Sequence, residues 1–167
     1  NKQISDLLVT HPIIAAVRNN EEINVAVRSS VGIIFLLNAT LSNLRKRIDL
    51  IKAANKLVFV HLDMVLGLSK DHASLEFLQN EMKPTGIITT KPNLIHPAQD
   101  YGLLTIQRLF ILDSLSIQTG LKMVQTNPPD FIEIMPGIVP KVIPNIKTYT
   151  QIPVIAGGMV STKEEII

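Results

Sequence analysis

The stretch FIEIMPGIVPKVIPNIKTYTQIPVIAGG, residues 131–158, contains the repeating unit that decides the fold. It begins with an aliphatic run over 131–137, continues through a segment of helical periodicity over 139–149, and ends with a second aliphatic run over 153–158. Apolar residues that are continuous rather than alternating are typical of strands in parallel sheets covered by helices. The stretch therefore predicts a strand–helix–strand unit with two parallel strands.

The same unit recurs along the whole chain. Aliphatic runs predict strands at 12–17, 31–39, 57–63, 86–90, 103–110, 131–137 and 153–158. Amphipathic segments predict helices at 42–55, 71–82, 113–127, 139–149 and 161–167. Asp71 is the expected N-cap of the second of these helices, and Ser161 with Glu164 is the expected capping box of the last. Repetition of this unit at spacings of roughly 20–30 residues predicts an α/β fold, a TIM (β/α)8-type barrel.

The predicted barrel is a single domain over residues 1–167. The chain ends inside the seventh strand–helix unit, whereas a closed barrel needs an eighth strand to cover its sheet edge. We therefore expect a truncated barrel whose C-terminal strand and helix are missing. An open edge would favour a homo-oligomer, although the sequence leaves the oligomeric state open. An open doubly wound sheet is the alternative architecture, because it also alternates strands and helices.

Composition excludes several classes of protein. The chain has 167 residues, of which 46% are hydrophobic and 18% charged, so it can bury a core and is not a disordered chain. It has no cysteine, which excludes disulfide scaffolds and thiol nucleophiles and fits a cytoplasmic location. No apolar run approaches the length of a membrane span, so no membrane partner is expected. The net charge of +2 permits nucleic-acid binding without indicating it.

Polar residues gather where the predicted strands end. In barrels of this type the carboxyl ends of the strands and the loops that follow carry the functional residues. A lone charge in a buried strand is costly, so several polar groups that converge on one rim predict a site. The candidates are Arg18, Asn38, His61, Asp63, Lys91, Gln107, Arg108, Asp113 and Glu133.

Two glycine-containing turns are further candidates. Gly157 and Gly158 follow the last predicted strand, so the backbone there could approach a ligand, and the next helix would offer free N–H groups to a phosphate. A tight turn that needs glycine for its dihedral angles explains the same residues without a ligand. The turn MPGIVPK, residues 135–141, contains Gly137 and predicts either a second ligand-contacting loop or plain loop geometry.

The ionisable candidates have more than one interpretation. His61 and Asp63 are two residues apart, so they would face the same side of a strand and could transfer protons, bind a metal or simply bond to each other. Glu133 could be a general base, although a pairing with Arg108 or Lys91 is the commoner role. Lys91 could form a Schiff base only if it were neutral, and nearby carboxylates would instead keep it charged for anion binding. Two candidate ligands do not specify a metal, so neither a metal nor a cofactor is assigned.

The helix expected at 42–55 has a local excess of positive charge. Arg45, Lys46, Arg47 and Lys52 stand there against Asp49 alone. Such a surface could bind a polyanion such as RNA. A run of charges on a helix is usually only a solvated face, and both interpretations stay open here.

Several stretches together resemble the bacterial glycerol uptake operon antiterminator family. They occur in order over nearly the whole chain: PIIAAVR, VFVHLDMVLGLSKD, GIITTK, GLLTIQRLFILDS, PDFIEIMPGIVPKVI and PVIAGGMVSTKEEI. The resemblance implies a TIM-barrel-like regulator, rather than an enzyme, that senses sn-glycerol 3-phosphate. It also implies a leader-mRNA partner and prevention of premature termination of transcription of glycerol-utilisation genes.

The resemblance and the residues meet at the ligand. The Gly157–Gly158 turn would hold the phosphate, Lys91 or Arg108 would add a charged contact, and His61, Asp63 and Glu133 would bind the hydroxyls. Arg18 and Gly137 complete the expected ligand site. The residues alone favour a barrel enzyme for a small phosphorylated substrate, and a phosphate-ligand binding protein with no RNA role is a third hypothesis.

Overall fold

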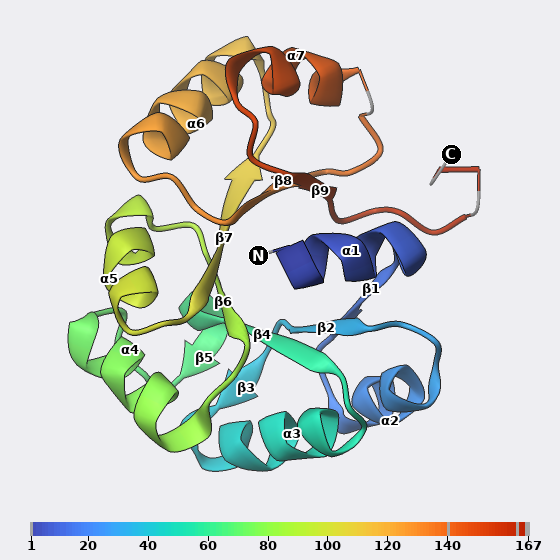
Figure 1. Ribbon diagram of the computed structural model, residues 1–167, viewed down its shortest axis with the longest axis vertical. Helices are drawn as coiled ribbons and strands as arrows, with labels where there is room; N and C mark the ends of the chain where they lie inside the picture. Colours follow the sequence, from blue (N-terminus) through green and yellow to red (C-terminus); the bar gives the residue numbers. More distant parts are fainter. Residues whose placement is uncertain (1, 140, 163, 166–167) are drawn as a thin grey trace. The chain divides into compact units, whose positions relative to one another are not determined.

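The computed structural model describes residues 2–139, 141–162 and 164–165. Within this part of the chain strands alternate with helices, and every pairing between neighbouring strands described below is parallel (Figure 1). The chain divides into two compact units, Asn1–Ile88 with Pro97–Leu104, and Thr89–His96 with Thr105–Ile167. Each unit has its own strands and helices.

The first unit is built on buried parallel strands. They are β1 (Ile14–Val17), β2 (Ile33–Leu36), β4 (Leu57–His61) and β6 (Gly86–Thr89), and each pairs with the next. Phe35 stands opposite Phe59 in the β2–β4 register, and their rings pack edge to face with centroids 5.8 Å apart. Burial of β2 along its whole length explains why its aliphatic run is continuous.

Helices precede or follow these strands in the sequence. They are α1 (Lys2–Thr10), α2 (Asn20–Arg28), α3 (Leu41–Ala53), α4 (His72–Phe77), which continues as a π-helical segment (Leu78–Met82), and α5 (Ile95–Asp100), which follows a 3-10 turn (Pro92–Leu94). Asp71 caps α4 as predicted, because its carboxylate accepts a hydrogen bond from the Ser74 N–H at 2.9 Å. A small parallel pair, β3 (Ala39–Thr40) with β5 (Val65–Leu66), was not predicted.

In the second unit, one face of the sheet packs against helices and the other face carries a buried pair of charged residues. Its strands are β7 (Leu104–Phe110), β8 (Phe131–Met135) and β9 (Val154–Ala156), and its helices are α6 (Ser114–Thr126) and α7 (Val142–Tyr149). Leu109, Ile132 and Ile134 pack in one apolar core with residues of both helices. Because side chains alternate along a strand, Arg108 and Glu133 lie on the opposite face, which we call the inner face.

The parallel α/β fold is confirmed, and all seven predicted strands are present within the expected runs. Closure of a barrel and its truncation stay predictions. The helix expected at 161–167 lies partly outside the described residues, since 163, 166 and 167 are not described. Glu164 and Glu165 form a turn, and Glu165 rather than Glu164 accepts the Ser161 N–H, so the capping partner was wrong by one position. Among the described helices none is both long enough and apolar enough to cross a membrane.

Candidate functional site

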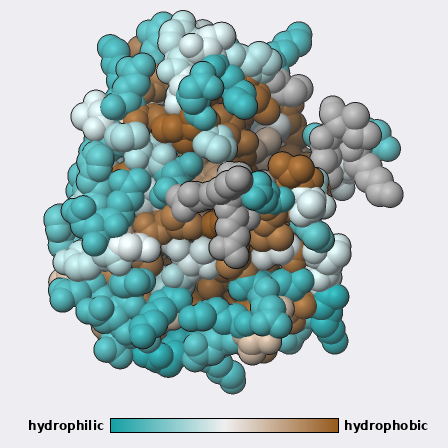
Figure 2. Space-filling model, in the orientation of Figure 1, coloured by the Kyte–Doolittle hydropathy of each residue, from teal (hydrophilic) through white to brown (hydrophobic). Residues whose placement is uncertain are grey.

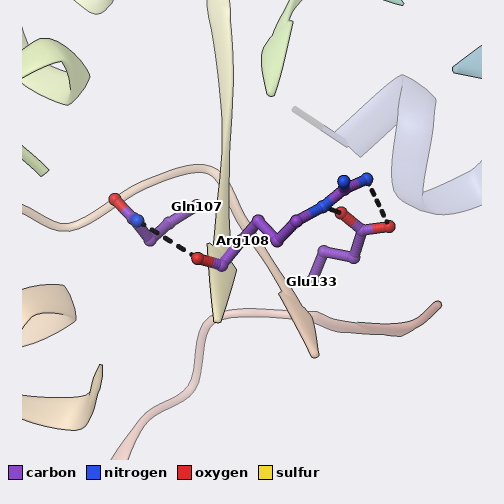
Figure 3. A network of polar contacts seen from close by, with 3 residues as sticks. All are labelled: Gln107, Arg108 and Glu133. Atoms are coloured by element: carbon purple, nitrogen blue, oxygen red, sulfur yellow. Dashed lines mark hydrogen bonds and ion pairs between the residues drawn. The ribbon is translucent and has the colours of Figure 1, made fainter. Parts of the chain in front are cut away.

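A buried ion pair occupies the inner face of the second unit (Figure 3). Arg108 Nε donates to Glu133 Oε2 at 2.7 Å, and Arg108 Nη2 donates to Glu133 Oε1 at 3.3 Å. The side chains are only 9% and 4% exposed, and the register places the two residues directly opposite each other on β7 and β8. Two parallel bonds fix the orientation of both groups. The expected pairing of Glu133 is confirmed, and Arg108 rather than Lys91 is the partner.

Three glycines lie in the loops after β8 and β9, and one of them, Gly157, packs directly against this pair. A Cβ at Gly157 would lie 2.5 Å from Glu133 Oε1, and one at Gly137 would lie 2.9 Å from the backbone N of Gly157. Gly158 has a φ of +75°, which favours glycine. The Gly137 N–H donates to the Gly158 carbonyl at 3.1 Å, so the two loops are joined. Close packing and backbone geometry therefore require glycine at these positions whether or not a ligand binds.

The turn after β9 already satisfies some of its N–H groups. The Gly157 N–H donates to the Ile134 carbonyl at 2.9 Å and so extends the sheet. Glu165 Oε2 accepts bonds from the Ser161 N–H at 2.6 Å, the Thr162 N–H at 3.0 Å and the Ser161 hydroxyl at 3.2 Å. The Ser161 N–H, followed by the Thr162 N–H, holds the pKa of the Glu165 carboxyl below its ordinary value. An internal carboxylate thus stands where an anion was expected.

Lys91 belongs to the second unit and is exposed. It precedes the 3-10 turn after β6, and its backbone N–H donates to Thr89 Oγ1 at 3.1 Å. A neutral lysine requires removal from water or crowding by other cations, so an exposed Lys91 suits anion binding better than Schiff-base chemistry.

The remaining ligand candidates belong to the first unit. His61 is buried at the end of β4, whereas Asp63 lies in the 3-10 turn Leu62–Met64, so the expectation that both face one side of a strand is wrong. The strand ends two residues before Asp63, so the alternation of side chains along a strand does not relate Asp63 to His61. Arg18 is exposed after β1, and its N–H donates to Glu22 Oε2 at 2.6 Å.

Two other polar candidates, Asp113 and Gln107, form hydrogen bonds within the protein. Asp113 caps α6 by accepting the Ser116 N–H at 2.7 Å. Gln107 is 1% exposed, and Figure 3 shows it extending to the opposite side of β7 from the Arg108 side chain. Gln107 Nε2 donates to the Arg108 carbonyl at 3.4 Å, while no described group bonds to its Oε1. Within the described part of the chain, no three His, Cys, Asp or Glu side chains are placed to hold a metal ion.

The cations of α3 mostly bind their own protein. Arg45 forms an exposed ion pair with Glu81 at 3.4 Å, and Lys52 Nζ donates to the Lys83 carbonyl at 3.0 Å. Arg47 Nη1 donates to the Asn38 carbonyl at 2.7 Å and also to the Arg18 carbonyl at 3.3 Å. These intramolecular bonds orient the cations along the protein surface.

Comparison with known proteins identifies the family. A family model described as glycerol-3-phosphate responsive antiterminator matches residues 13–167, which is nearly the whole chain. The chain belongs to this antiterminator family. The resemblance inferred from the quoted stretches is therefore confirmed.

Proteins similar to this chain agree with it in sequence and in structure. A glycerol uptake operon antiterminator regulatory protein from Listeria monocytogenes is 34% identical, with a TM-score of 0.88 over 92% of this chain and 83% of that one. A glycerol uptake operon antiterminator-related protein from Thermotoga maritima is 31% identical, with a TM-score of 0.81 over 91% and 85%. The protein YgcP of Escherichia coli K12 is 36% identical over 159 residues, which are 95% of this chain and 83% of YgcP.

Proposed function

We propose that this protein is a regulator that senses sn-glycerol 3-phosphate, binds the leader mRNA of glycerol-utilisation genes and prevents premature termination of transcription. The family match over residues 13–167 carries this proposal. A role in transcription would place the protein in the cytoplasm. Its effector would be a small phosphorylated ligand, and no resident cofactor is required.

The inner face of the second unit offers suitable chemistry for the ligand. Arg108 uses two of its donors on Glu133, and a guanidinium has five, so others remain for phosphate. Lys91 adds a second positive charge, and the Gly157–Gly158 and Gly137 turns add backbone. Glu133, fixed in place by Arg108, would accept hydrogen bonds from hydroxyls. Roles for Arg18, His61 and Asp63 in the first unit stay predictions from the sequence.

Two observations favour a regulator over a TIM-barrel enzyme that acts on a phosphorylated substrate. Both carboxylate oxygens of Glu133 accept bonds from Arg108, which is a poor arrangement for a general base. Lys91 is exposed, which is a poor environment for a neutral amine nucleophile. We therefore assign no catalytic residue.

One experiment separates the three hypotheses. Leader-RNA affinity is measured with and without glycerol 3-phosphate at one fixed salt concentration, and the fate of the ligand is followed by phosphorus NMR. A regulator should show a ligand-dependent gain in affinity of about 5- to 150-fold, the usual range for coupling between two sites. Turnover of the ligand would indicate an enzyme, and ligand binding without an effect on RNA would indicate a simple binding protein; either result would contradict the proposal.

A further inference from the structure

A groove runs between α6 and α7 on the helical side of the second unit, where Figure 1 shows the two helices side by side. It has a volume of about 410 Å³. Residues at successive turns of one face of α6 line it together with two residues of α7. The members used below are Gln118, Leu121, Lys122, Gln125, Asn145 and Tyr149. The groove therefore lies on the face opposite the Arg108–Glu133 pair.

The lining has the chemistry of a single-stranded RNA site. Carboxamide groups such as Gln118 and Asn145 can both donate to and accept from the edges of unpaired bases. Tyr149 is 59% exposed, and its ring provides a surface on which a base can stack. Lys122 supplies a positive charge at the same groove for the phosphate backbone.

The charge around the groove also favours a polyanion. The sequence has no Asp or Glu at 114–129 or at 134–163, whereas it has lysines at 122, 141, 147 and 163. The two carboxylates between these segments have other roles. Asp130 accepts hydrogen bonds from Thr105, and Glu133 is buried against Arg108. Asp113, which directly precedes the first segment, caps α6 by accepting the Ser116 N–H. An approaching phosphate backbone would therefore meet more lysines than carboxylates along these segments.

The basic surface of α3 is less suitable. Arg45, Arg47 and Lys52 already bind a carboxylate or backbone carbonyls, and these bonds would have to be replaced by bonds to RNA. Figure 2 shows hydrophilic surface at the lower margin, where Figure 1 places α3, as expected of a solvated helix face. The chain has two tyrosines, and neither lies on α3.

We propose that an unpaired segment of the leader mRNA binds in the α6–α7 groove, with bases against Tyr149 and the carboxamides and phosphate against Lys122. This inference rests on the proposed function and adds the RNA-contacting surface to it. It also separates the surface for RNA from the inner face proposed for the ligand, since the two lie on opposite faces of β7 and β8.

The test uses the full chain and a fluorescent leader transcript of the glycerol-uptake operon from the same organism, titrated by anisotropy at saturating glycerol 3-phosphate and several salt concentrations. The variants are Lys122→Gln and Tyr149→Ala. The matched control is Lys46→Gln, which removes an exposed lysine from α3. Thermal melting of each variant confirms that it is folded.

Loss of one phosphate contact to single-stranded RNA should lower the slope of log affinity against log salt by about 0.7 in Lys122→Gln. Tyr149→Ala should weaken binding roughly 5- to 150-fold, which corresponds to loss of one stacked base. Lys46→Gln should leave both quantities unchanged.

Three outcomes would overturn this inference. If the wild-type protein did not bind the leader transcript, both the proposed function and this inference would be refuted. Normal RNA binding by the wild type and by both groove variants would refute the groove as the RNA site and leave the proposed function standing. Sedimentation showing that RNA-free wild type self-associates while Tyr149→Ala is monomeric would make the groove an interface between copies of the chain.

Discussion

Removing one partner of the Arg108–Glu133 pair should destabilise the protein far more than removing both. In Arg108→Met the Glu133 side chain, which is 4% exposed, would keep its carboxylate buried without the guanidinium partner. Loss of one member of a buried pair costs about 3–5 kcal/mol, which is a large part of the roughly 5–15 kcal/mol that stabilises a typical domain. For a chain of this size the midpoint of thermal unfolding should fall by roughly 6–20 °C.

The double variant Arg108→Met/Glu133→Met should recover most of this loss. Two apolar side chains of similar length would fill the same space, and replacement of a whole buried pair in this way is often neutral or stabilising. Urea unfolding followed by circular dichroism gives the free energies for a double-mutant cycle over the two single variants and the double variant.

The exposed pair of Arg45 and Glu81 provides the control. Its side chains are 52% and 57% exposed, so Arg45→Met should change the free energy of unfolding by less than about 1 kcal/mol. Two results would refute the reasoning: a double variant as unstable as Arg108→Met, or an Arg108→Met variant no less stable than Arg45→Met.

Three further predictions concern Gly157, Asp113 and Glu165. Gly157→Ala should lower the free energy of unfolding by about 1–3 kcal/mol in urea titrations, because the new methyl group would overlap the Glu133 carboxylate. Glu133→Ala should relieve that overlap. If Gly157→Ala cost the same free energy in the wild type and in Glu133→Ala, this prediction would be contradicted. Asp113→Ala should cost about 0.5–2 kcal/mol through loss of the α6 cap, measured by thermal unfolding against Asp100→Ala as a control, and an unchanged midpoint would contradict it. The folded-state pKa of Glu165 is lowered, so the stabilisation that Glu165 gives to the turn is complete above the unfolded pKa of about 4.3 and is lost as pH falls through the folded pKa. Amide exchange at Ser161 and Thr162, corrected for intrinsic rates, should therefore show greater opening of the turn at that low pH. Opening that does not depend on pH would contradict this prediction.

The strands were predictable from sequence because burial on both faces leaves a continuous aliphatic run, as β2 does. The small β3–β5 pair was not, since two-residue strands are too short to show a pattern. Helix α2 was also missed, because it has only 9 residues and buries only Ile23 and Ala26. Segment ends were less certain than segment type: β4 stops at His61, which moved Asp63 into a turn.

The candidate site was predictable only in part. A glutamate inside an aliphatic run had to be paired, and the sequence narrowed its partner to two cations. The choice between Arg108 and Lys91 depended on the register of β7 against β8, which no local pattern specifies. The contact of Arg47 with the Arg18 carbonyl also joins residues that are far apart in the sequence. By contrast, the absence of carboxylates within α6 and α7 could be read directly from the sequence.

The Arg108–Glu133 pair also bears on how the strands find their alignment during folding. The apolar pattern resists a slip of one residue, because every side chain would change faces. A slip of two residues would keep each side chain on its face, so burial alone discriminates weakly against it. It would, however, place Arg108 opposite Phe131 or Met135 and leave two buried charges apart. The ion pair thus excludes misalignments that hydrophobicity tolerates.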